Sequence, residues 1–411
     1  LTVVHGDVAL EGLGLSKAHR DALDIDACDH VFHAAALYDL AGDPAVLETV
    51  NVGGTRNLLA LIDADKFNGT LHFLSSIAVA GLHHGLFTED MLEKRQLFPT
   101  EYHRTKYESE RLVRASRVRR RIYRPGAVVG HSETGEMDRI DGAYYLFRAI
   151  QAARTTLPRW VTLPRIDLPP VPMVPVDFVA DAIDAIAHAG GHDGKCFHVL
   201  DAQPPKFRET FNLIADAADA PRMGRARLSK LADFIPGGKN VIGQLGMVRF
   251  FRKEVLEDLG IPPVVHEVMS AETQFDTTNF MAALEGTGLR CPPQEEYVEA
   301  LWDYYRRHLD PSADPEAVFR KALANKIVVI TGASSGIGEA LARHAGSLGA
   351  TVALIARRAE ELERVSAAIG IDKSSCHPAD LTDLEACDRV IADVIARHGR
   401  IDVLVNNAGI T

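Results

Sequence analysis

The sequence has few cysteines, and their spacing is irregular. Five occur in 411 residues, with no Cys-x-x-Cys pair among them. An odd count without paired spacing fits neither a disulfide framework nor a zinc site, and it predicts a reducing, cytoplasmic setting. The 17 histidines likewise show no metal-ligand spacing, so we expect no bound metal.

Positive charge and long apolar runs are also scarce. Lys and Arg number 45 against 56 Asp and Glu, a formal net charge of −11, which disfavours nucleic acid as a partner. No apolar run approaches the roughly 18 residues of a membrane span. What remains is a globular composition, 46% hydrophobic and 25% charged, at a length that predicts two or three domains.

The first part of the chain alternates short apolar strands with helical patterns. We expect strands over 30–36, 71–76 and 121–130, and helices over 46–66 and 101–118. This alternation is typical of an α/β fold with a parallel sheet.

A less regular stretch follows within the same domain, which we place at 1–308. Residues 131–175 are rich in turn residues and prolines, residues 207–308 are mostly helical in pattern, and we assign both to a substrate-side region. Between them, a helix over 175–189 and a strand over 196–200 continue the alternation.

A linker over 309–325 leads into a second domain, 326–411, which opens with an apolar strand and the sequence TGASSGIG. Gly332 permits the tight turn, Gly336 lets the backbone approach a pyrophosphate, and Gly338 brings the following helix close to the strand. The helix amino end adds N–H donors and a favourable dipole. We therefore expect two successive Rossmann-like, doubly wound parallel sheets. The loop residues expected to bind a dinucleotide are Gly332, Ser334, Ser335, Gly336, Ile337 and Gly338.

Two arginines, Arg357 and Arg358, follow the second strand of this domain, at the place where an acidic residue would bind the ribose hydroxyl of NADH. Two guanidinium groups favour a 2′-phosphate instead, so we predict NADPH as the cofactor. The alternative is that both are solvated charges at the start of a helix.

Tyr102 and Lys106 are four residues apart on a predicted helix, so both side chains lie on one face. An ammonium near a phenol favours the phenolate, which lets a tyrosine exchange a proton with a substrate oxygen. Ser76, at the end of the strand upstream, is placed to hold that oxygen, whereas Ser75 points to the opposite face of a regular strand. A surface pair without function remains the alternative for Tyr102 and Lys106 taken alone.

The second domain resembles the compact short-chain dehydrogenases/reductases through TGASSGIG, the dipeptide DL and the run NNAG. The family's catalytic Ser and Tyr-x-x-x-Lys come after this run, so we expect the chain to lack the second active site. The resemblance places five further residues at the cofactor: Asp380 and Leu381, which bracket the adenine, and Asn407, Ala408 and Gly409 beyond the fourth strand.

The first domain resembles the extended short-chain dehydrogenases/reductases. Five elements stand in the family's order: HAAA at 33–36, NVGGT at 51–55, LSS at 74–76, Tyr102-x-x-x-Lys106 and YRPG at 123–126. The resemblance implies that Lys106 binds the nicotinamide ribose, while Asn51 is expected to tie a helix to a strand. It assigns the other cofactor contacts to Asp7 and Val8 at the adenine, Ala34 and Ala35 at the phosphates, and Pro125 and Gly126 at the nicotinamide face.

Three further runs, GDVALEGLGLS, GHSETGEMDRIDGAYYLF and PMVPVDFVADAI, are similar to the fatty acyl-CoA reductase and thioester reductase branch. An extended domain followed by a compact one is similar to the two-domain, alcohol-forming fatty acyl-CoA reductases of bacteria. The resemblance implies NADPH-dependent reduction of a long-chain acyl-CoA to aldehyde and on to alcohol, with Ser76 and Tyr102 at the carbonyl oxygen. We also expect a homo-oligomer and leave peripheral membrane contact open.

The two ends of the chain, LTVVHGD and NNAGIT, both fall at strands. We expect a piece of a longer polypeptide in which the first domain lacks its first strands and glycine loop. Because the first strand lies centrally in a doubly wound sheet, we expect this piece alone to fold poorly and to reduce nothing.

Other interpretations stay open. One is a nucleotide-sugar epimerase or hydroxysteroid dehydrogenase fused to a second reductase, and another is a module that senses NADPH without catalysis. The arginines within 115–124 could meet coenzyme A phosphates or an anionic membrane, or could stabilise a helix carboxyl end. Residues 240–255 combine apolar and basic side chains, which suits an interfacial helix, an acyl-chain lid or an ordinary packed helix.

Overall fold

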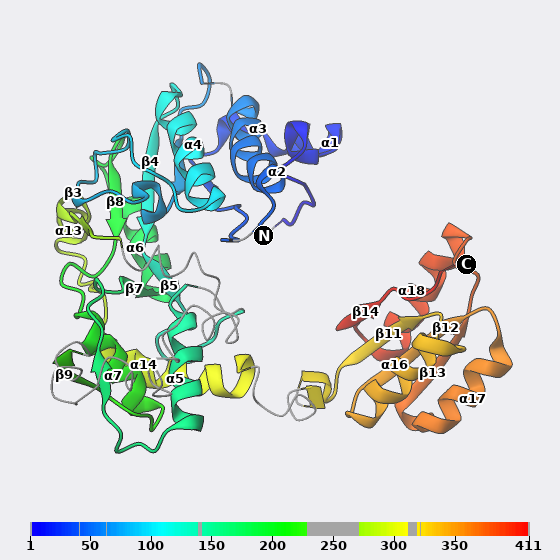
Figure 1. The fold of residues 1–411 in the computed structure, drawn as a ribbon. Coiled ribbons are helices and arrows are strands. Elements are labelled where there is room, and N and C mark those ends of the chain that lie inside the picture. Colours follow the sequence, from blue (N-terminus) through cyan, green and yellow to red (C-terminus); the bar gives the residue numbers. More distant parts are fainter. Residues whose placement is uncertain are drawn as a thin grey trace. The chain divides into compact units, whose positions relative to one another are not determined.

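The computed structural model describes residues 2–227, 271–310 and 319–409, apart from positions 41, 63, 139–141 and 321. The chain separates into two compact units, Leu1–Tyr305 and Arg306–Thr411, which are described one at a time (Figure 1). The division falls just before the predicted linker at 309–325.

A parallel sheet forms the centre of the first unit. Among the described residues its strand order is β1 (His30–His33), β2 (Thr70–Leu74), β4 (Arg120–Pro125) and β8 (Cys196–Val199). Side chains alternate between the two faces, as strand geometry requires. Ile122 packs with α3 (Gly54–Leu61) and α4 (Glu101–Ala115), while Tyr123 packs with α6 (Val176–His188) and α13 (Thr278–Leu284). Helices therefore cover both faces, and the predicted α/β fold is confirmed.

Shorter elements complete this unit. Pairs of short parallel strands are β3 (Gly85–Phe87) with β10 (Thr273–Phe275), β5 (Ala127–Val129) with β7 (Met173–Pro175), and β6 (Leu163–Arg165) with β9 (Met223–Arg227). Further helices are α1 (Lys17–Leu23), α2 (Pro44–Leu47), α5 (Tyr144–Thr156), α7 (Phe207–Ala217) and α14 (Gln294–Tyr304).

Two predicted elements are interrupted. The strand expected over 121–130 divides into β4 and β5 at Gly126, where a Cβ would lie 2.3 Å from the carbonyl oxygen of Pro172. The helix expected over 46–66 is shorter and contains a π-helical turn, Glu48–Gly53, between α2 and α3.

The predicted helical region 207–308 also holds the strands β9 and β10. Residues 228–270 lie outside the described residues, and with them the apolar and basic run 240–255.

The second unit has a parallel sheet of its own. Its described strands run in the order β13 (Ser374–Pro378), β12 (Thr351–Ala356), β11 (Ile327–Thr331) and β14 (Val403–Val405). Val328 of β11 packs with α16 (Gly336–Ser347) and α17 (Ala359–Ile369), and its neighbour Val329 packs with α18 (Leu384–His398) on the other face. The prediction of two successive Rossmann-like sheets is confirmed.

Candidate active site

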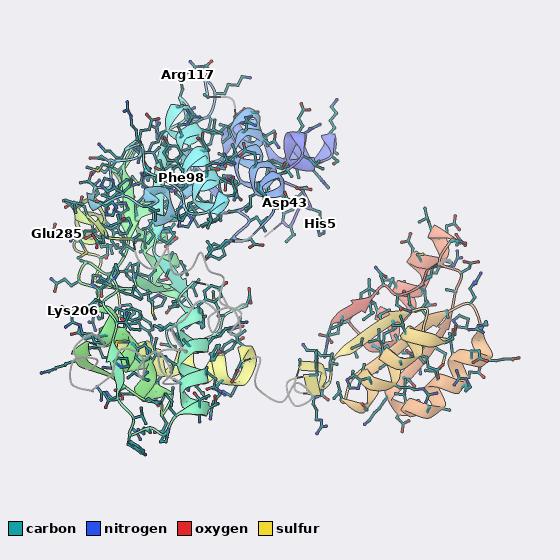
Figure 2. All side chains as sticks on the ribbon, in the orientation of Figure 1. His5, Asp43, Phe98, Arg117, Lys206 and Glu285 are labelled. Atoms are coloured by element: carbon teal, nitrogen blue, oxygen red, sulfur yellow. The ribbon has the colours of Figure 1, made fainter. Side chains whose placement is uncertain are left out.

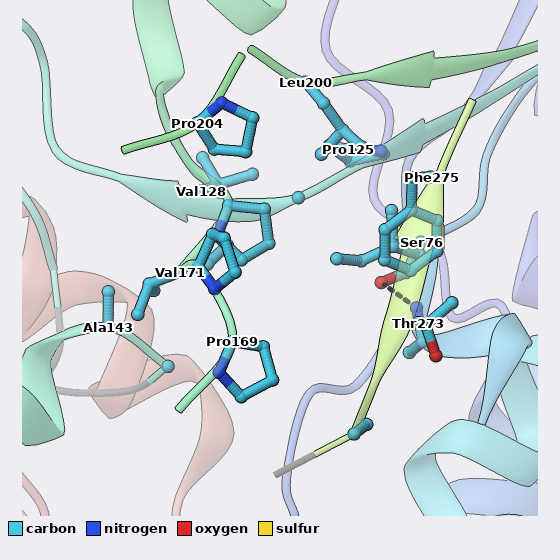
Figure 3. A pocket seen from close by; sticks show the side chains of 18 of the residues that line it. Ser76, Pro125, Val128, Ala143, Pro169, Val171, Leu200, Pro204, Thr273 and Phe275 are labelled. Carbon is cyan, nitrogen blue, oxygen red and sulfur yellow. Dashed lines mark hydrogen bonds between the residues drawn. The ribbon is translucent and has the colours of Figure 1, made fainter. Parts of the chain in front are cut away.

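A cavity of about 630 Å³ lies in the first unit, where the chain leaves β2, β4 and β8 (Figure 3). The carboxyl ends of parallel strands meet at one edge of a sheet, which is where α/β proteins bind ligands. Ser76 comes to the cavity from the end of β2, Pro125 and Gly126 from β4, and Leu200 from β8. Other lining residues are Tyr38, Tyr102, His103, Val128, Tyr145, Pro169–Pro172 and Thr273–Phe275.

The two serines at the end of β2 have different partners. Ser76 begins the 3-10 turn Ile77–Ala80, and its Oγ accepts a hydrogen bond from the backbone N–H of Ala78 at 3.1 Å. The hydroxyl proton of Ser76 therefore stays available to a ligand in the cavity. Ser75 also borders the cavity, but its hydroxyl donates to Oε2 of the buried Glu110 at 2.6 Å. The geometry agrees with the choice of Ser76 as the ligand-facing serine.

Tyr102 and Lys106 lie on α4, whose amino end is capped by the Thr100 side chain. The Tyr102 ring lines the cavity and meets the Tyr38 ring edge to face, with the centroids 4.7 Å apart. Lys106 is buried beneath them, and its Nζ donates to the carbonyl oxygen of Leu74 at 2.8 Å. The structure thus brings Ser76, Tyr102 and Lys106 to one end of the sheet.

Burial changes the acidity of Lys106. Desolvation lowers its pKa from 10.5 to about 8, and the nearby charge of Glu110 opposes this shift. Since the shifted pKa still exceeds 7, the ammonium persists at neutral pH. A buried cation one helical turn from Tyr102 favours the ionised phenol in a proton transfer.

Asn51 connects three elements and does not line the cavity. Its Oδ1 accepts from the backbone N–H of Leu37 at 2.7 Å, and its Nδ2 donates to the Leu37 carbonyl at 3.0 Å and to Oγ1 of Thr105 at 3.1 Å. These bonds hold the loop after β1 against α4. The expectation that Asn51 ties helix to strand agrees with this geometry.

The residues assigned to the adenine and phosphate lie apart from the cavity. Asp7 is exposed and accepts from the backbone N–H of Ala9, while the Val8 carbonyl accepts from Asn57 of α3 at 2.9 Å. Ala34 and Ala35 are exposed just after β1. Their roles at a cofactor stay predictions.

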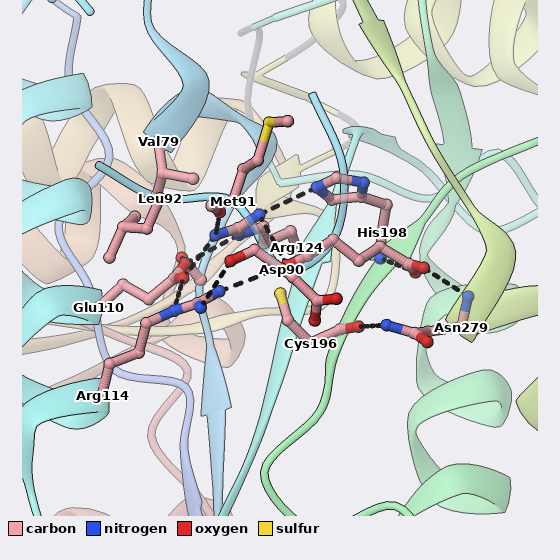
Figure 4. A network of polar contacts seen from close by, with 12 residues as sticks. Val79, Asp90, Met91, Leu92, Glu110, Arg114, Arg124, Cys196, His198 and Asn279 are labelled. Carbon is pink, nitrogen blue, oxygen red and sulfur yellow. Dashed lines mark hydrogen bonds and ion pairs between the residues drawn. The ribbon is translucent and has the colours of Figure 1, made fainter. Parts of the chain in front are cut away.

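Sequence reasoning missed a buried ion pair under the site. Arg124, which is fully buried, donates from Nη2 to Oε1 of Glu110 at 2.6 Å and from Nε to Oε2 at 3.0 Å (Figure 4). Burial alone would raise the pKa of Glu110, but the Arg124 charge and its hydrogen bonds lower it to about 2. Two features of the sequence could have pointed to this ion pair. Glu110 lies four residues after Lys106 on the same helix, and the run YRPG contains an arginine.

Glu89 was missed as well, and it holds one wall of the cavity. This buried carboxylate accepts from the backbone N–H groups of His198 at 2.9 Å, Phe280 at 3.0 Å and Asn279. Burial raises its pKa to about 7, against the effect of these three donors. Because Asn279 and Phe280 follow β10 closely, Glu89 fixes the strand that carries Thr273 and Phe275.

The glycine loop of the second unit has the geometry that the sequence predicted. Gly332 and Gly336 have positive φ angles of +67° and +62°, and α16 begins at Gly336. A Cβ on Gly338 would lie 2.3 Å from the carbonyl oxygen of Gly332, so only glycine permits this approach of helix to turn. Arg358 reaches over the loop, with Nη2 donating to Oγ of Ser334 at 3.1 Å and of Ser335 at 3.0 Å.

The other predicted cofactor residues of this unit lie around the loop in different surroundings. Nδ2 of Asn407 donates to the Thr331 carbonyl at 3.1 Å, which ties the segment after β14 to the glycine loop. Hydrogen bonds from Thr382 lower the pKa of Asp380, with a smaller effect of the Arg357 charge. Leu381 packs against the core beneath α18, whereas Ile337, Ala408 and Gly409 are exposed.

Four arginines of 115–124 form ion pairs within the protein, namely Arg117, Arg119, Arg121 and Arg124, whereas Nε of Arg120 is buried without a hydrogen-bond partner among the described residues. Arg121 donates to the carbonyls of Ala187 at 3.0 Å and Ala189 at 2.8 Å, at the carboxyl end of α6. Arg117, on the outer surface in Figure 2, pairs with Asp65 at 3.1 Å. Arg121 therefore lies at a helix carboxyl end, while Arg117 is part of a surface ion pair. In the described part of the chain no helix is long and apolar enough to cross a bilayer.

Comparisons with known proteins support an oxidoreductase. Residues 1–183 match the NAD-binding model described as male sterility protein, and residues 326–411 match the short chain dehydrogenase model. The chain is 28% identical over 414 aligned residues to the glycine betaine reductase ATRR of Emericella nidulans, covering 93% of this chain and 30% of that protein. It is 45% identical over 96 residues to the fatty acyl-CoA reductase of Acinetobacter baylyi, covering 23% of this chain and 32% of that protein. The chain thus spans about a third of the length of these relatives.

Solved structures show the same fold. The terminal R domain of the myxalamid PKS-NRPS pathway superposes with a TM-score of 0.58 at 24% identity, covering 76% of each chain. A thiolation-reductase di-domain of an archaeal non-ribosomal peptide synthetase gives 0.54 at 18% identity, covering 73% of this chain and 60% of that one. The predictions of an extended reductase domain fused to a compact one, and of a nicotinamide cofactor, are confirmed by the family matches.

Proposed function

We propose that this chain, which joins a domain of the male sterility protein family at 1–183 to a short chain dehydrogenase domain at 326–411, is part of an enzyme that reduces long-chain fatty acyl-CoA with NADPH to the aldehyde and on to the alcohol. The observation that carries the proposal is one cavity of about 630 Å³ that is lined by Ser76 and Tyr102, with Lys106 buried behind them. This volume lies in the ~300–1,000 Å³ range of small-molecule sites.

The residues at the cavity have different roles in the proposed reaction. The Ser76 hydroxyl and the Tyr102 phenol hold the substrate carbonyl oxygen, and Tyr102 passes its proton to that oxygen as negative charge develops there. Lys106 supplies the positive charge that favours this transfer and binds the ribose. A nicotinamide cofactor supplies the hydride when it is bound.

The rest of the lining suits an acyl chain. Figure 3 shows Val128 and Val171 near Pro204 and Pro169, and Phe275 across from them beside Ser76. Such walls bury methylene groups without leaving polar groups unpaired. The acyl chain is therefore held by burial, and the carbonyl by Ser76 and Tyr102.

The glycine loop of the second unit fits a dinucleotide phosphate, because the missing side chain at Gly338 and the positive φ of Gly336 bring backbone N–H groups to the start of α16. Arg358 lies across the loop serines and, with Arg357, would hold the 2′-phosphate of NADPH.

A second candidate substrate is a quaternary ammonium compound, since one relative is named a glycine betaine reductase. The cavity offers the aromatic rings of Tyr38, Tyr145 and Phe275 together with the carboxylate of Asp201, and aromatic faces attract such cations. A carrier-bound or coenzyme A thioester of betaine is the matching substrate.

The test uses the complete polypeptide with NADPH, offered a long-chain acyl-CoA and, separately, a betaine thioester, with the products separated by chromatography. Fatty aldehyde or alcohol supports the proposal, and a product from the betaine thioester alone selects the second candidate. If neither thioester oxidises NADPH, the proposal is wrong, and sugar nucleotides and steroids become the next substrates to assay.

Tyr102→Phe adds a test of mechanism. The loss of its proton should lower turnover by at least about 100-fold. Tyr107→Phe is the matched control, because Tyr107 lies on the same helix, packs on Phe98 and does not line the cavity. Equal turnover in both variants would remove Tyr102 from the proposed mechanism.

A further inference from the structure

His103 lies beside Tyr102 on α4 and lines the same cavity. Its side chain is buried, and its ring centroid is 5.9 Å from that of Tyr102, with the two rings nearly perpendicular. His103 therefore brings a polar ring to the cavity in addition to Ser76 and Tyr102.

Thr100 contacts one ring nitrogen of His103 and leaves the other to the cavity side. Oγ1 of Thr100 accepts from the backbone N–H of His103 as the helix cap, at 3.4 Å, and lies 2.7 Å from Nδ1 of the same residue. The hydroxyl that accepts the backbone N–H keeps its own proton, and in one of the two neutral tautomers it donates that proton to Nδ1. The proton of the neutral ring is then on Nε2.

The ring is held in this neutral form. Burial lowers the pKa of His103 from 6.5 to about 4, and a position in the first turn of a helix also disfavours a cation. Thr100 is the only hydrogen-bond partner of the imidazole among the described residues. In this tautomer Nε2–H is an uncharged donor on a ring that lines the cavity, and the ring stays neutral throughout the neutral pH range.

This inference rests on the proposed function. We propose that Nε2–H of His103 donates a hydrogen bond to the sulfur of the substrate thioester as the carbon–sulfur bond breaks. The carbonyl oxygen already has two donors, Ser76 and Tyr102, and the sulfur is bonded to the same carbon as that oxygen. His103, which follows Tyr102 on the helix, is a third polar group at the same cavity and can serve this second atom.

The reaction balances with this role. When the carbonyl carbon accepts a hydride from the bound nicotinamide, the carbonyl electrons move to oxygen, which takes the proton of Tyr102. The oxygen then returns this proton to Tyr102 as the carbon–oxygen double bond re-forms and the carbon–sulfur bond breaks, and the electron pair leaves on sulfur. His103 stabilises that thiolate by its hydrogen bond, and water supplies the proton of the released thiol. The products are an aldehyde, a thiol and NADP⁺.

The experiment compares His103→Phe with the parent polypeptide on substrates that differ only in the leaving group. An alkyl thioester should lose about 100-fold in kcat, since this is the usual effect of removing one donor from a developing charge. A thioester of an aryl thiol, whose thiolate is stable without a hydrogen bond, should lose less than about threefold. Reduction of the free aldehyde, which has no leaving group, should be unchanged.

Two further variants separate this role from a structural one. His103→Gln keeps a side-chain N–H and should restore part of the alkyl thioester rate, whereas Tyr107→Phe should change none of the three rates. NADPH affinity and the thermal midpoint are measured for each variant. If His103→Phe does not fold, the ratio of alkyl to aryl rates in His103→Gln against the parent still decides the question.

The outcomes are distinguishable. Equal losses on alkyl thioester, aryl thioester and aldehyde would overturn the role at sulfur. If the parent polypeptide reduces no thioester at all, the proposed function itself is wrong.

Discussion

The hydroxyl of Ser75 donates a hydrogen bond to Oε2 of Glu110, 2.6 Å away, and so joins the end of β2 to the middle of α4. This contact uses the Ser75 hydroxyl in the protein interior. Its neighbour Ser76 carries the same functional group and also lines the cavity. The Ser76 oxygen accepts a hydrogen bond from the backbone N–H of Ala78.

We predict opposite effects of removing the two hydroxyls. Ser75→Ala should destabilise the first unit by roughly 1.5–3 kcal/mol, because a buried hydrogen bond to a charged group is lost, and should change kcat by less than threefold. Ser76→Ala should lower kcat by about 100-fold with little change in stability. Urea denaturation and steady-state kinetics check both, and a Ser76→Ala variant with full turnover would remove this residue from the site.

Replacing only one partner of the Glu110–Arg124 ion pair should strongly lower the free energy of unfolding of the first unit. Glu110→Gln leaves the Arg124 guanidinium buried without its counter-charge, and a loss of about 3–5 kcal/mol is expected. The double variant Glu110→Leu with Arg124→Met should lose less stability than the sum of the losses in the single variants Glu110→Leu and Arg124→Met. A double-mutant cycle in urea measures the difference, and additive single effects would show that the two charges do not interact.

Turnover should fall as pH rises through about 8. The pKa of Lys106 is lowered to about 8 by burial, so its charge is complete below that pH and lost above it, together with its effect on Tyr102. Lys106→Arg should be less active but should show no decline over this range, because arginine keeps its charge. A pH profile of kcat from 6.5 to 10 tests this, and a flat parent profile would contradict it.

The stability of the first unit should fall in mild acid. Burial lowers the pKa of His33, His72, His103 and His198 from 6.5 to about 4. Between these values the unfolded chain binds protons that the folded protein does not, so stability is lost as pH falls below 6.5, by up to about 1.4 kcal/mol per pH unit for each residue.

Unfolding free energies measured from pH 7 to pH 5 give this slope. His72→Gln should lower the dependence of the unfolding free energy on pH by about the contribution of one titrating group. His19→Gln, a change at an exposed position on α1, should leave this dependence unaltered. A parent slope near zero would contradict the prediction.

Arg358→Ala should weaken NADPH binding at the second unit by about 10- to 100-fold and leave NADH nearly unaffected, since only NADPH carries the phosphate that the guanidinium would hold. Arg389→Ala, on the exposed side of α18, is the control. Fluorescence titration with both nucleotides measures the effect. Equal weakening of NADPH and NADH would assign Arg358 to shaping the loop through Ser334 and Ser335.

The sequence by itself determined what depends on neighbours along the chain. The strand and helix alternation, the glycine loop at 331–338 and the spacing of Tyr102 to Lys106 follow from local backbone geometry and helical periodicity, so the α/β fold and the reductase family could be predicted. The choice of Ser76 over Ser75 followed from the alternation of side chains at a strand end.

Tertiary structure alone decided what depends on residues far apart in sequence. Glu89 meets His198 and Phe280 across more than a hundred residues, and the break at Gly126 exists because the carbonyl of Pro172 lies against it. The lowered pKa of Lys106 and the neutral state of His103 likewise come from burial, which is a property of the packed interior. Periodicity reports which face of an element is apolar, but only packing decides which charges lose their water and which hydroxyl is left free for a substrate.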